Sequence, residues 1–390
     1  MGRFIVLVVD GLGIGAMEDV KANRKEDIGA NTLRHVFSEV SSLRIPNLEK
    51  LGIMNALDYE TDYMKKSFNC TYGKCALNHP GADSFLGHQE IMGRKYFNRN
   101  IQVFSEKANE IGALLQTQGY KVEYIRKEKN SKLLCIGEYA IIADSLEGDI
   151  GQIYSVTADL NKISYEEVLK IANTIRENSQ VPRITVNGAF VPIDKLKLFI
   201  EKKQNGVIGI NLVKSGVYED RGYINANLPF YNKDRDQIQY LLKDRDIPVI
   251  LIGKAGDIIQ NPHGKNLIEK DTENILNLTL REIINTKEAF ILSNVQGTDM
   301  AGHLQDVSKY AIELKKIDDY IGKMISLINK EDILIVTGDH GNDPTIGHSK
   351  HTREYVPILI YGHHNLKGFI GKIPTLSYIS SMAKEYFLCN

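Results

Sequence analysis

The feature that most constrains this 390-residue chain is a set of apolar runs without polar alternation. The first, "RFIVLVVDGLGIGA" at 3–16, strings Val, Ile and Leu together before an Asp and a glycine-rich turn. Such runs are typical of parallel strands that are buried on both faces of a sheet. Four similar runs occur late in the chain, at 248–258, 288–297, 332–341 and 356–362.

Stretches with helical periodicity separate most of these runs. Apolar residues recur at helical spacing in 271–286 and 306–330, and the first of these stretches begins with an Asp or a Thr suited to an N-cap. Alternation of strands and helices predicts an α/β fold with a doubly wound, mostly parallel sheet. Ligands in such sheets bind beyond the carboxyl ends of the strands.

The middle of the chain has a different order of elements. We expect a helix near 104–119, strands at 120–125 and 133–143, a helix near 164–178, and further strands to about 213. This mixed order predicts an α+β cap domain inserted at 99–222. The catalytic core then comprises 1–98 and 223–390.

Composition excludes several classes of protein. Apolar residues make up 43% and charged residues 25%, as in ordinary globular proteins, and the net charge of -1 argues against nucleic-acid or membrane-surface binding. A small basic pocket for a phosphate stays compatible with that charge. The four scattered Cys fit a reducing compartment, and no apolar run is long enough for a membrane span, so we expect a cytoplasmic protein.

Acidic and histidine residues gather where the predicted strands end. Because the carboxyl ends of parallel strands meet at one edge of a sheet, these residues should lie together. Three Asp and three His can hold two divalent cations, and this mixture suits Mn²⁺ or Zn²⁺ better than Mg²⁺. Any one of them alone could instead be a helix cap, a turn residue or a surface histidine. The set consists of Asp10, Asp299, His303, Asp339, His340 and His351.

A second cluster is "HPGADSFLGHQEIMG" at 79–93. Its small residues predict a turn that leads into a helix and presents the hydroxyl of Ser84, and a helix N-terminus favours a bound anion. A nearby metal would lower the pKa of that hydroxyl and make it a nucleophile. The alternative is that Ser84 serves only as a helix N-cap.

Together these segments resemble the phosphopentomutases of the alkaline phosphatase superfamily. The resemblance is carried by "VVDGLGIGA", "GADSFLGHQEIMG", "GKAGDI", "DMAGH" and, most specifically, "GDHGNDPTIGHSKHTREYVPILIYG". The chain resembles a divergent member of this family. Ser84 stands where the phosphopentomutases usually have Thr, and a Ser at this position is similar to the cofactor-independent phosphoglycerate mutases. Ala82 stands where the family has a Lys. Asn187 stands in the cap where an Arg is expected.

The resemblance implies a role for each matching residue. Asp10, Asp339 and His340, with the Ser84 oxygen, would bind one metal. Asp299, His303 and His351 would bind the other, and Ser84 would carry the phosphoryl group. The implied substrate contacts are Asp159, Arg183, Arg221 and Lys254.

We therefore expect a phosphomutase that acts on ribose or deoxyribose phosphate through a phosphoserine, with two divalent ions. Mn²⁺ is the expected metal, with Zn²⁺ or Mg²⁺ as alternatives. The partner is a small sugar phosphate, with no nucleic acid and no membrane, and we expect a monomer. Two alternatives stay open: a mutase for another phosphorylated substrate, and a phosphatase or phosphodiesterase in which water attacks the phosphoenzyme. A non-catalytic binding protein is a third hypothesis, which would predict lost metal ligands.

Overall fold

The computed structural model describes residues 2–94, 102–128, 131–148, 150–203, 206–230, 236–364 and 366–388. The chain divides into two compact units, 1–96 with 234–390 and 97–233, so that the second is inserted into the first. The first predicted domain boundary, at 98, lies outside the described residues. The second predicted boundary lies between 222 and 223. The structure differs here, because β10 (Ile224–Pro229) pairs with β7 (Arg183–Ala189), so that residues 224–229 belong to the inserted unit.

The first unit is built on an eight-stranded sheet with the order β12-β11-β13-β1-β14-β15-β2-β16. The five strands from β12 to β14 are parallel, β15 runs antiparallel to both of its neighbours, and β2 and β16 are parallel to each other. The strands are β1 (Arg3–Val9), β2 (Thr71–Cys75), β11 (Val249–Gly253), β12 (Lys265–Leu267), β13 (Ala289–Val295), β14 (Ile333–Thr337), β15 (Val356–Gly362) and β16 (Gly368–Ile373).

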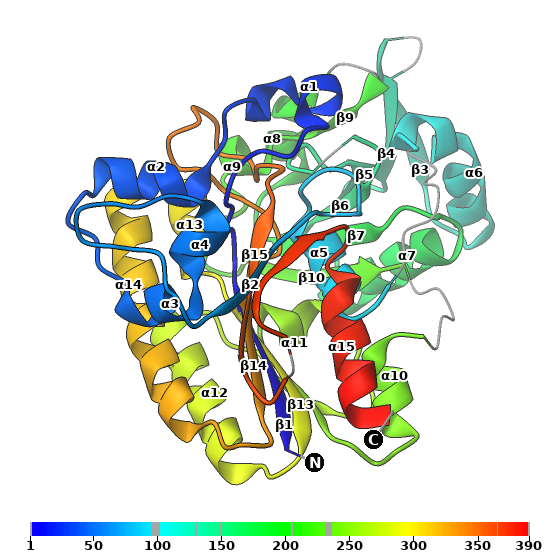
Figure 1. The fold of residues 1–390 in the computed structure, drawn as a ribbon. Coiled ribbons are helices and arrows are strands. Elements are labelled where there is room, and N and C mark those ends of the chain that lie inside the picture. The colour runs from blue at the N-terminus through cyan, green and yellow to red at the C-terminus, as the bar shows by residue number, and fades with distance from the viewer. Residues whose placement is uncertain are drawn as a thin grey trace. The chain divides into compact units, whose positions relative to one another are not determined.

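Helices cover both faces of this sheet (Figure 1). Phe4 of β1 stacks on Phe290 of β13 and packs against Tyr386 and Phe387 of α15. On the opposite face, the Ser293 hydroxyl of β13 lies 2.6 Å from the Thr279 hydroxyl of α12. The predicted doubly wound sheet is therefore confirmed.

The helices of the first unit lie between its strands along the chain, except α15, which follows the last strand. They are α1 (Val20–Asn23), the 3₁₀ turn η1 (Lys25–Asp27), α2 (Thr32–Glu39), α3 (Pro46–Leu51), α4 (Ile53–Leu57), α5 (Ser84–Ile91), α10 (Ile238–Lys243), α11 (Lys254–Ile258), α12 (Thr272–Asn285), α13 (Gly297–His303), α14 (Val307–Leu327) and α15 (Ser377–Leu388). Asp271 caps α12 and Asp306 caps α14, each by accepting a hydrogen bond from a backbone N–H three residues later.

The apolar content of 248–258 predicts a single strand, but the structure divides this run into a strand and a helix. The strand ends at Gly253, and Lys254 begins α11. Gly253 has φ 71°, and a Cβ at this position would lie 2.3 Å from the carbonyl oxygen of Asn294. Only glycine fits such a turn, which brings the start of α11 to the edge of the sheet.

The inserted unit has a six-stranded sheet with the order β10-β7-β6-β5-β4-β3. The stretch 133–143 forms a hairpin across Gly137 (φ 54°) rather than the single expected strand. Helices α6 and α7 cover one face of the sheet. Its elements are α6 (Phe104–Thr117), β3 (Val122–Glu128), β4 (Ser131–Ile136), β5 (Ala140–Asp144), β6 (Ile153–Asp159), α7 (Tyr165–Glu177), β7, α8 (Ile193–Leu198), β8 (Ile200–Lys202), β9 (Ile208–Ile210), α9 (Leu212–Ser215) and β10.

Within the described residues, no helix is both long enough and apolar enough to cross a membrane.

Candidate metal centre

The first candidate metal group consists of Asp10, Asp339 and His340. Asp10 directly follows β1, and the other two follow β14, its parallel neighbour in the sheet. All three side chains are fully buried, and one potential ligand atom from each lies within 4.8 Å of the others. His340 Nε2 is 3.3 Å from both Asp10 Oδ1 and Asp339 Oδ2. The ends of two parallel strands thus bring together two carboxylates and an imidazole.

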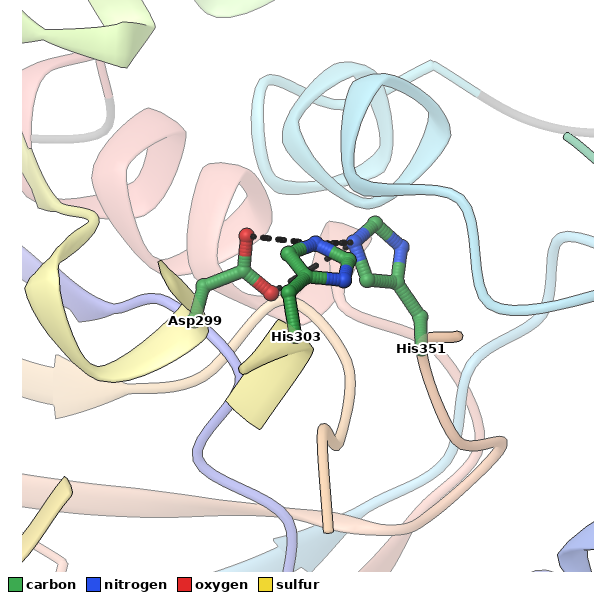
Figure 2. A group of neighbouring side chains, drawn as sticks. All are labelled: Asp299, His303 and His351. Carbon is green, nitrogen blue, oxygen red and sulfur yellow. Dashed lines mark hydrogen bonds and ion pairs between the residues drawn. The ribbon is translucent and has the colours of Figure 1, made fainter. Parts of the chain in front are cut away.

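The second group consists of Asp299, His303 and His351 (Figure 2). Asp299 and His303 lie one turn apart on α13, which follows β13, and His351 comes from the loop between β14 and β15. His303 Nε2 is 3.3 Å from Asp299 Oδ2, and His351 Nε2 is 3.4 Å from Asp299 Oδ1. The rings of His351 and His340 stack with centroids 3.8 Å apart, so the two groups are neighbours.

The Nδ1 atoms of both histidines in the second group contact backbone carbonyls. His303 Nδ1 lies 2.7 Å from Ser349 O, and His351 Nδ1 lies 2.8 Å from Ala82 O. A carbonyl can only accept, so each Nδ1 carries the hydrogen and each neutral ring turns the lone pair of Nε2 toward Asp299. Metal-binding histidines are commonly oriented by such a contact on the second nitrogen.

Charges in the two groups shift the pKa values of their members. Burial alone would lower the pKa of His340, but Asp339 and Asp10 outweigh it and raise the value to about 9. Burial would likewise lower the pKa of His303, yet its contact with Asp299 raises it. The pKa of His351 is lowered by burial and by His340. The site therefore holds protons that a divalent cation would displace.

Lys254 joins the two groups. Its Nζ lies 2.8 Å from Asp10 Oδ2 and 3.8 Å from Asp299 Oδ2. Burial opposes its charge, but the three aspartates of the two groups raise its pKa above the usual value. Lys254 was expected to contact a substrate or phosphate, and the structure places its ammonium on the aspartates of the two groups.

Ser84 lies beside the first group. Its Oγ donates a 2.5 Å hydrogen bond to Asp339 Oδ2, and its side chain is buried. Asp83 is the N-cap of α5, because its carboxylate accepts a hydrogen bond from Leu86 N. The Ser84 hydroxyl is therefore not used as a cap, and it faces the cluster of acidic and histidine residues.

The loop that carries His351 is tied to the loop that precedes Ser84. Arg353 Nη1 donates to the carbonyls of His79 and Gly81, and its Nη2 donates to that of Leu77. The Arg353 Nε lies 2.9 Å from both carboxylate oxygens of Asp19. This side chain is 7% exposed, and its guanidinium holds the two loops together.

The sequence did not single out two residues that contact the groups directly. Asn342 Nδ2 donates to Asp299 Oδ1 at 2.8 Å. His88 Nδ1 lies 3.3 Å from Asp339 Oδ2. His88 is one helical turn after Ser84 on α5, so the spacing Ser-x-x-x-His was the signal available for it.

The predicted substrate contacts of the inserted unit do not form one cluster. Asp159 ends β6 and Arg183 begins β7, and these strands are parallel, with Arg183 in register with Ile153. Six residues of strand separate the two positions along the sheet, about 20 Å. Arg221 lies just before β10, whose first residue pairs with Gly188, near the Asp159 end. Asp159 Oδ1 accepts hydrogen bonds from Asn161 N and Nδ2.

Comparisons with known proteins agree with this arrangement. A family model described as the Metalloenzyme superfamily matches residues 244–390, which include five of the six members of the two groups. The phosphopentomutase of Buchnera aphidicola is 28% identical over 423 residues, covering 100% of this chain and 97% of that protein. The phosphopentomutase of Dictyoglomus turgidum is also 28% identical, with coverage of 99% and 94%.

Among solved structures, a phosphoglycerate mutase of Leishmania mexicana is 13% identical with a TM-score of 0.41, covering 93% of this chain and 90% of that one. The two phosphopentomutases, by contrast, align with nearly the whole of this chain.

Proposed function

We propose that this chain, a divergent relative of the phosphopentomutases, is a metal-dependent phosphomutase. Such an enzyme is an isomerase, and here it would move a phosphoryl group between the 1- and 5-oxygens of ribose or deoxyribose. The observation that carries the proposal is the 2.5 Å hydrogen bond from Ser84 Oγ to Asp339 Oδ2. It joins a potential nucleophile to a carboxylate of a group suited to a divalent ion.

Two divalent cations fit the residues present. Asp10 Oδ1 and His340 Nε2 are buried, and neither makes a well-directed hydrogen bond with any residue of the described ranges. A buried carboxylate oxygen and imidazole nitrogen without such bonds are costly unless a proton or a cation lies between them. We assign one ion to Asp10, Asp339 and His340 with the Ser84 oxygen, and one to Asp299, His303 and His351. Mn²⁺ is our first choice, with Zn²⁺ and Mg²⁺ as the ions to compare.

Cations held there would offset the charge on a transferring phosphoryl group. In the reaction, the free hydroxyl of the sugar phosphate attacks the phosphorus on Ser84, the bond from that phosphorus to Ser84 Oγ breaks, and the hydroxyl proton passes to Oγ. The resulting bisphosphate turns round, and Ser84 Oγ attacks the other phosphorus. The bond from that phosphorus to the sugar oxygen breaks, the sugar oxygen takes the serine proton, and the phosphoserine is restored.

Lys254 contributes fixed positive charge between the two groups. Its ammonium, 2.8 Å from Asp10 Oδ2, reduces the repulsion among three aspartates and an arriving phosphate. In the inserted unit we retain Asp159 and Arg221 as candidate substrate contacts because they lie at one end of its sheet. Arg183, at the opposite end, would need a different ligand.

The test starts with protein loaded with Mn²⁺ and primed with a sugar bisphosphate. ³¹P NMR would follow ribose 1-phosphate and ribose 5-phosphate. We expect interconversion without release of phosphate, and we expect Ser84→Ala to abolish it while Mn²⁺ binding persists. Steady release of inorganic phosphate would instead assign the chain to the phosphatases. Full activity of Ser84→Ala would refute the phosphoserine.

A further inference from the structure

His88 is the one buried histidine of the described first unit that contacts both Ser84 and a member of the first metal group. Its side chain has no exposed surface. Its Nδ1 lies 2.8 Å from the backbone oxygen of Ser84, 3.3 Å from Asp339 Oδ2 and 3.5 Å from Ser84 Oγ. All three neighbours of this nitrogen are oxygen atoms that belong to the proposed nucleophile or to its carboxylate partner.

The chemistry of those neighbours determines the tautomer of His88. A carbonyl and a carboxylate can only accept hydrogen bonds, so Nδ1 must carry a hydrogen. Nε2 makes no hydrogen bond with any residue in the described ranges. A neutral His88 therefore cannot accept the Ser84 proton through Nδ1, which argues against a role as the general base for this hydroxyl.

The same contacts constrain the Asp339 carboxylate. Its Oδ2 accepts the Ser84 hydroxyl at 2.5 Å and also faces His88 Nδ1 and His340 Nε2, each at 3.3 Å. The backbone of α5 lies against Asp339 as well, because a Cβ on Gly87 would be 2.6 Å from Asp339 O. Besides Ser84 itself, His88 is thus a side chain on α5 that contacts the Asp339 carboxylate.

We propose that His88 is a positioning residue whose Nδ1–H holds the Ser84 carbonyl and Asp339 Oδ2, and so keeps Ser84 Oγ aimed at the first metal group. This inference rests on the proposed function for its kinetic consequence, but the tautomer and the geometry do not depend on it. The residue acts through Ser84 and Asp339 and need not touch the substrate.

Two amide variants distinguish the role of Nδ1 from that of Nε2. His88→Asn keeps an N–H donor at the position of Nδ1, whereas His88→Gln moves the amide one bond further, to the position of Nε2. His88→Leu removes both. We expect kcat of the Asn variant to stay within about tenfold of wild type. The kcat of the Gln and Leu variants should fall about 100-fold with little change in KM, a range typical of residues that orient ligands.

Two further measurements are independent of turnover. Long-range ¹H–¹⁵N NMR on metal-free wild-type protein should show a protonated Nδ1 on His88. Mn²⁺ titration should show weaker binding to one ion site, by about tenfold, in Gln and Leu but not in Asn. Either measurement can succeed even if the wild-type protein turns over no pentose phosphate, in which case only the proposed function fails.

An unprotonated Nδ1 in the neutral ring would overturn the proposal. Equal activity and equal Mn²⁺ affinity in the Asn and Gln variants would also overturn it. If a variant fails to fold, as judged by circular dichroism, the NMR measurement on the wild-type protein still shows whether Nδ1 of His88 carries the hydrogen that the proposal requires.

Discussion

The Nε2 atoms of His303 and His351 face each other across 3.1 Å, and each is within 3.4 Å of a carboxylate oxygen of Asp299. Because both Nδ1 atoms are turned to backbone carbonyls, the two neutral rings would present lone pairs to each other. That arrangement is unfavourable unless a proton or a cation is shared between them. We therefore expect the pair to form half of a cation site.

Removal of one member of this pair should abolish one ion site and spare the other. In His351→Ala, we expect the Mn²⁺ stoichiometry measured by calorimetry to fall from two to one. The affinity of the site formed by Asp299, His303 and His351 should fall at least about 100-fold. His348→Ala is the matched control in the same loop, because His348 Nε2 contacts Asp27 at 3.3 Å rather than either group. Loss of an ion in the control but not in His351→Ala would contradict the assignment.

Metal affinity should rise with pH. The pKa of His340 in the metal-free protein is raised to about 9, because Asp339 and Asp10 outweigh burial, so this ring is protonated at neutral pH. A bound cation must displace that proton, and Mn²⁺ affinity at the first group should increase about tenfold per pH unit between pH 7 and 8.5. Calorimetry in buffers of different ionisation enthalpy would count the proton released. Binding without proton release at pH 7 would refute this prediction.

The inserted unit should have its own pH dependence through Asp144. Burial raises the pKa of Asp144 to about 6, although the backbone N–H groups of Phe104 and Ile208 lower it in part. The folded protein then binds a proton that the unfolded chain has lost above pH 4. The stability from this group is complete below pH 4 and is lost as pH rises through 6, about 3 kcal/mol in all.

Asp144→Asn stays neutral at every pH, so it isolates this effect. The difference in the free energy of unfolding between variant and wild type should shift by about 2.4 kcal/mol in favour of the variant from pH 4 to pH 7. Urea denaturation at the two pH values measures it. Any hydrogen bond that Asn fails to replace adds the same cost at both pH values. A difference that does not change with pH would contradict the prediction.

Arg353→Lys should loosen the two loops that it joins. Lysine keeps the charge but cannot reach three carbonyls and Asp19 at once, so we expect a loss of about 2–4 kcal/mol in the free energy of unfolding. Lys350→Ala, in the same loop, removes only an exposed contact 3.7 Å from Glu26 and should cost less than about 0.5 kcal/mol. Thermal unfolding compares the two variants, and equal costs would show that the clamp is unimportant.

Gly87→Ala tests the close approach of α5 to Asp339. The added Cβ would meet Asp339 O at 2.6 Å, which forces the helix start and Ser84 away from the first group. We expect phosphoryl transfer to fall at least about 100-fold, since small displacements of reacting groups are costly. Wild-type turnover, with a normal circular dichroism spectrum, would show that the approach is not needed.

The positions of strand ends made it predictable that the residues of the two candidate groups lie together. Asp10, Asp299 and Asp339 each follow an apolar run, and parallel strands bring such ends to one edge whatever the connections between them. Strand direction was not predictable in the same way. The run 356–362 forms β15, which is antiparallel to β14, because apolar content records burial on both faces and carries no information about polarity.

Side-chain partners were harder to predict than positions. The placement of Lys254 on the aspartates depends on the turn at Gly253, which an apolar pattern does not reveal. The separation of Arg183 from Asp159 depends on the parallel register of β6 and β7, and short motifs do not contain that information. The sequence did not predict a role for His88, because its proposed role is to position Ser84 and Asp339, and the motifs point to those two residues directly.

The central position of β1 has a consequence for synthesis of the chain. β1 is translated long before either of its sheet neighbours, since Arg3 pairs with Ala289 and Phe4 pairs with Ile333. At ribosomal speeds of about 5–20 residues per second, this strongly apolar strand waits roughly 15–60 s for its first neighbour. Until then, Asp10 has no site to join. The nascent chain must therefore keep "RFIVLVV" from aggregating while the whole inserted unit emerges.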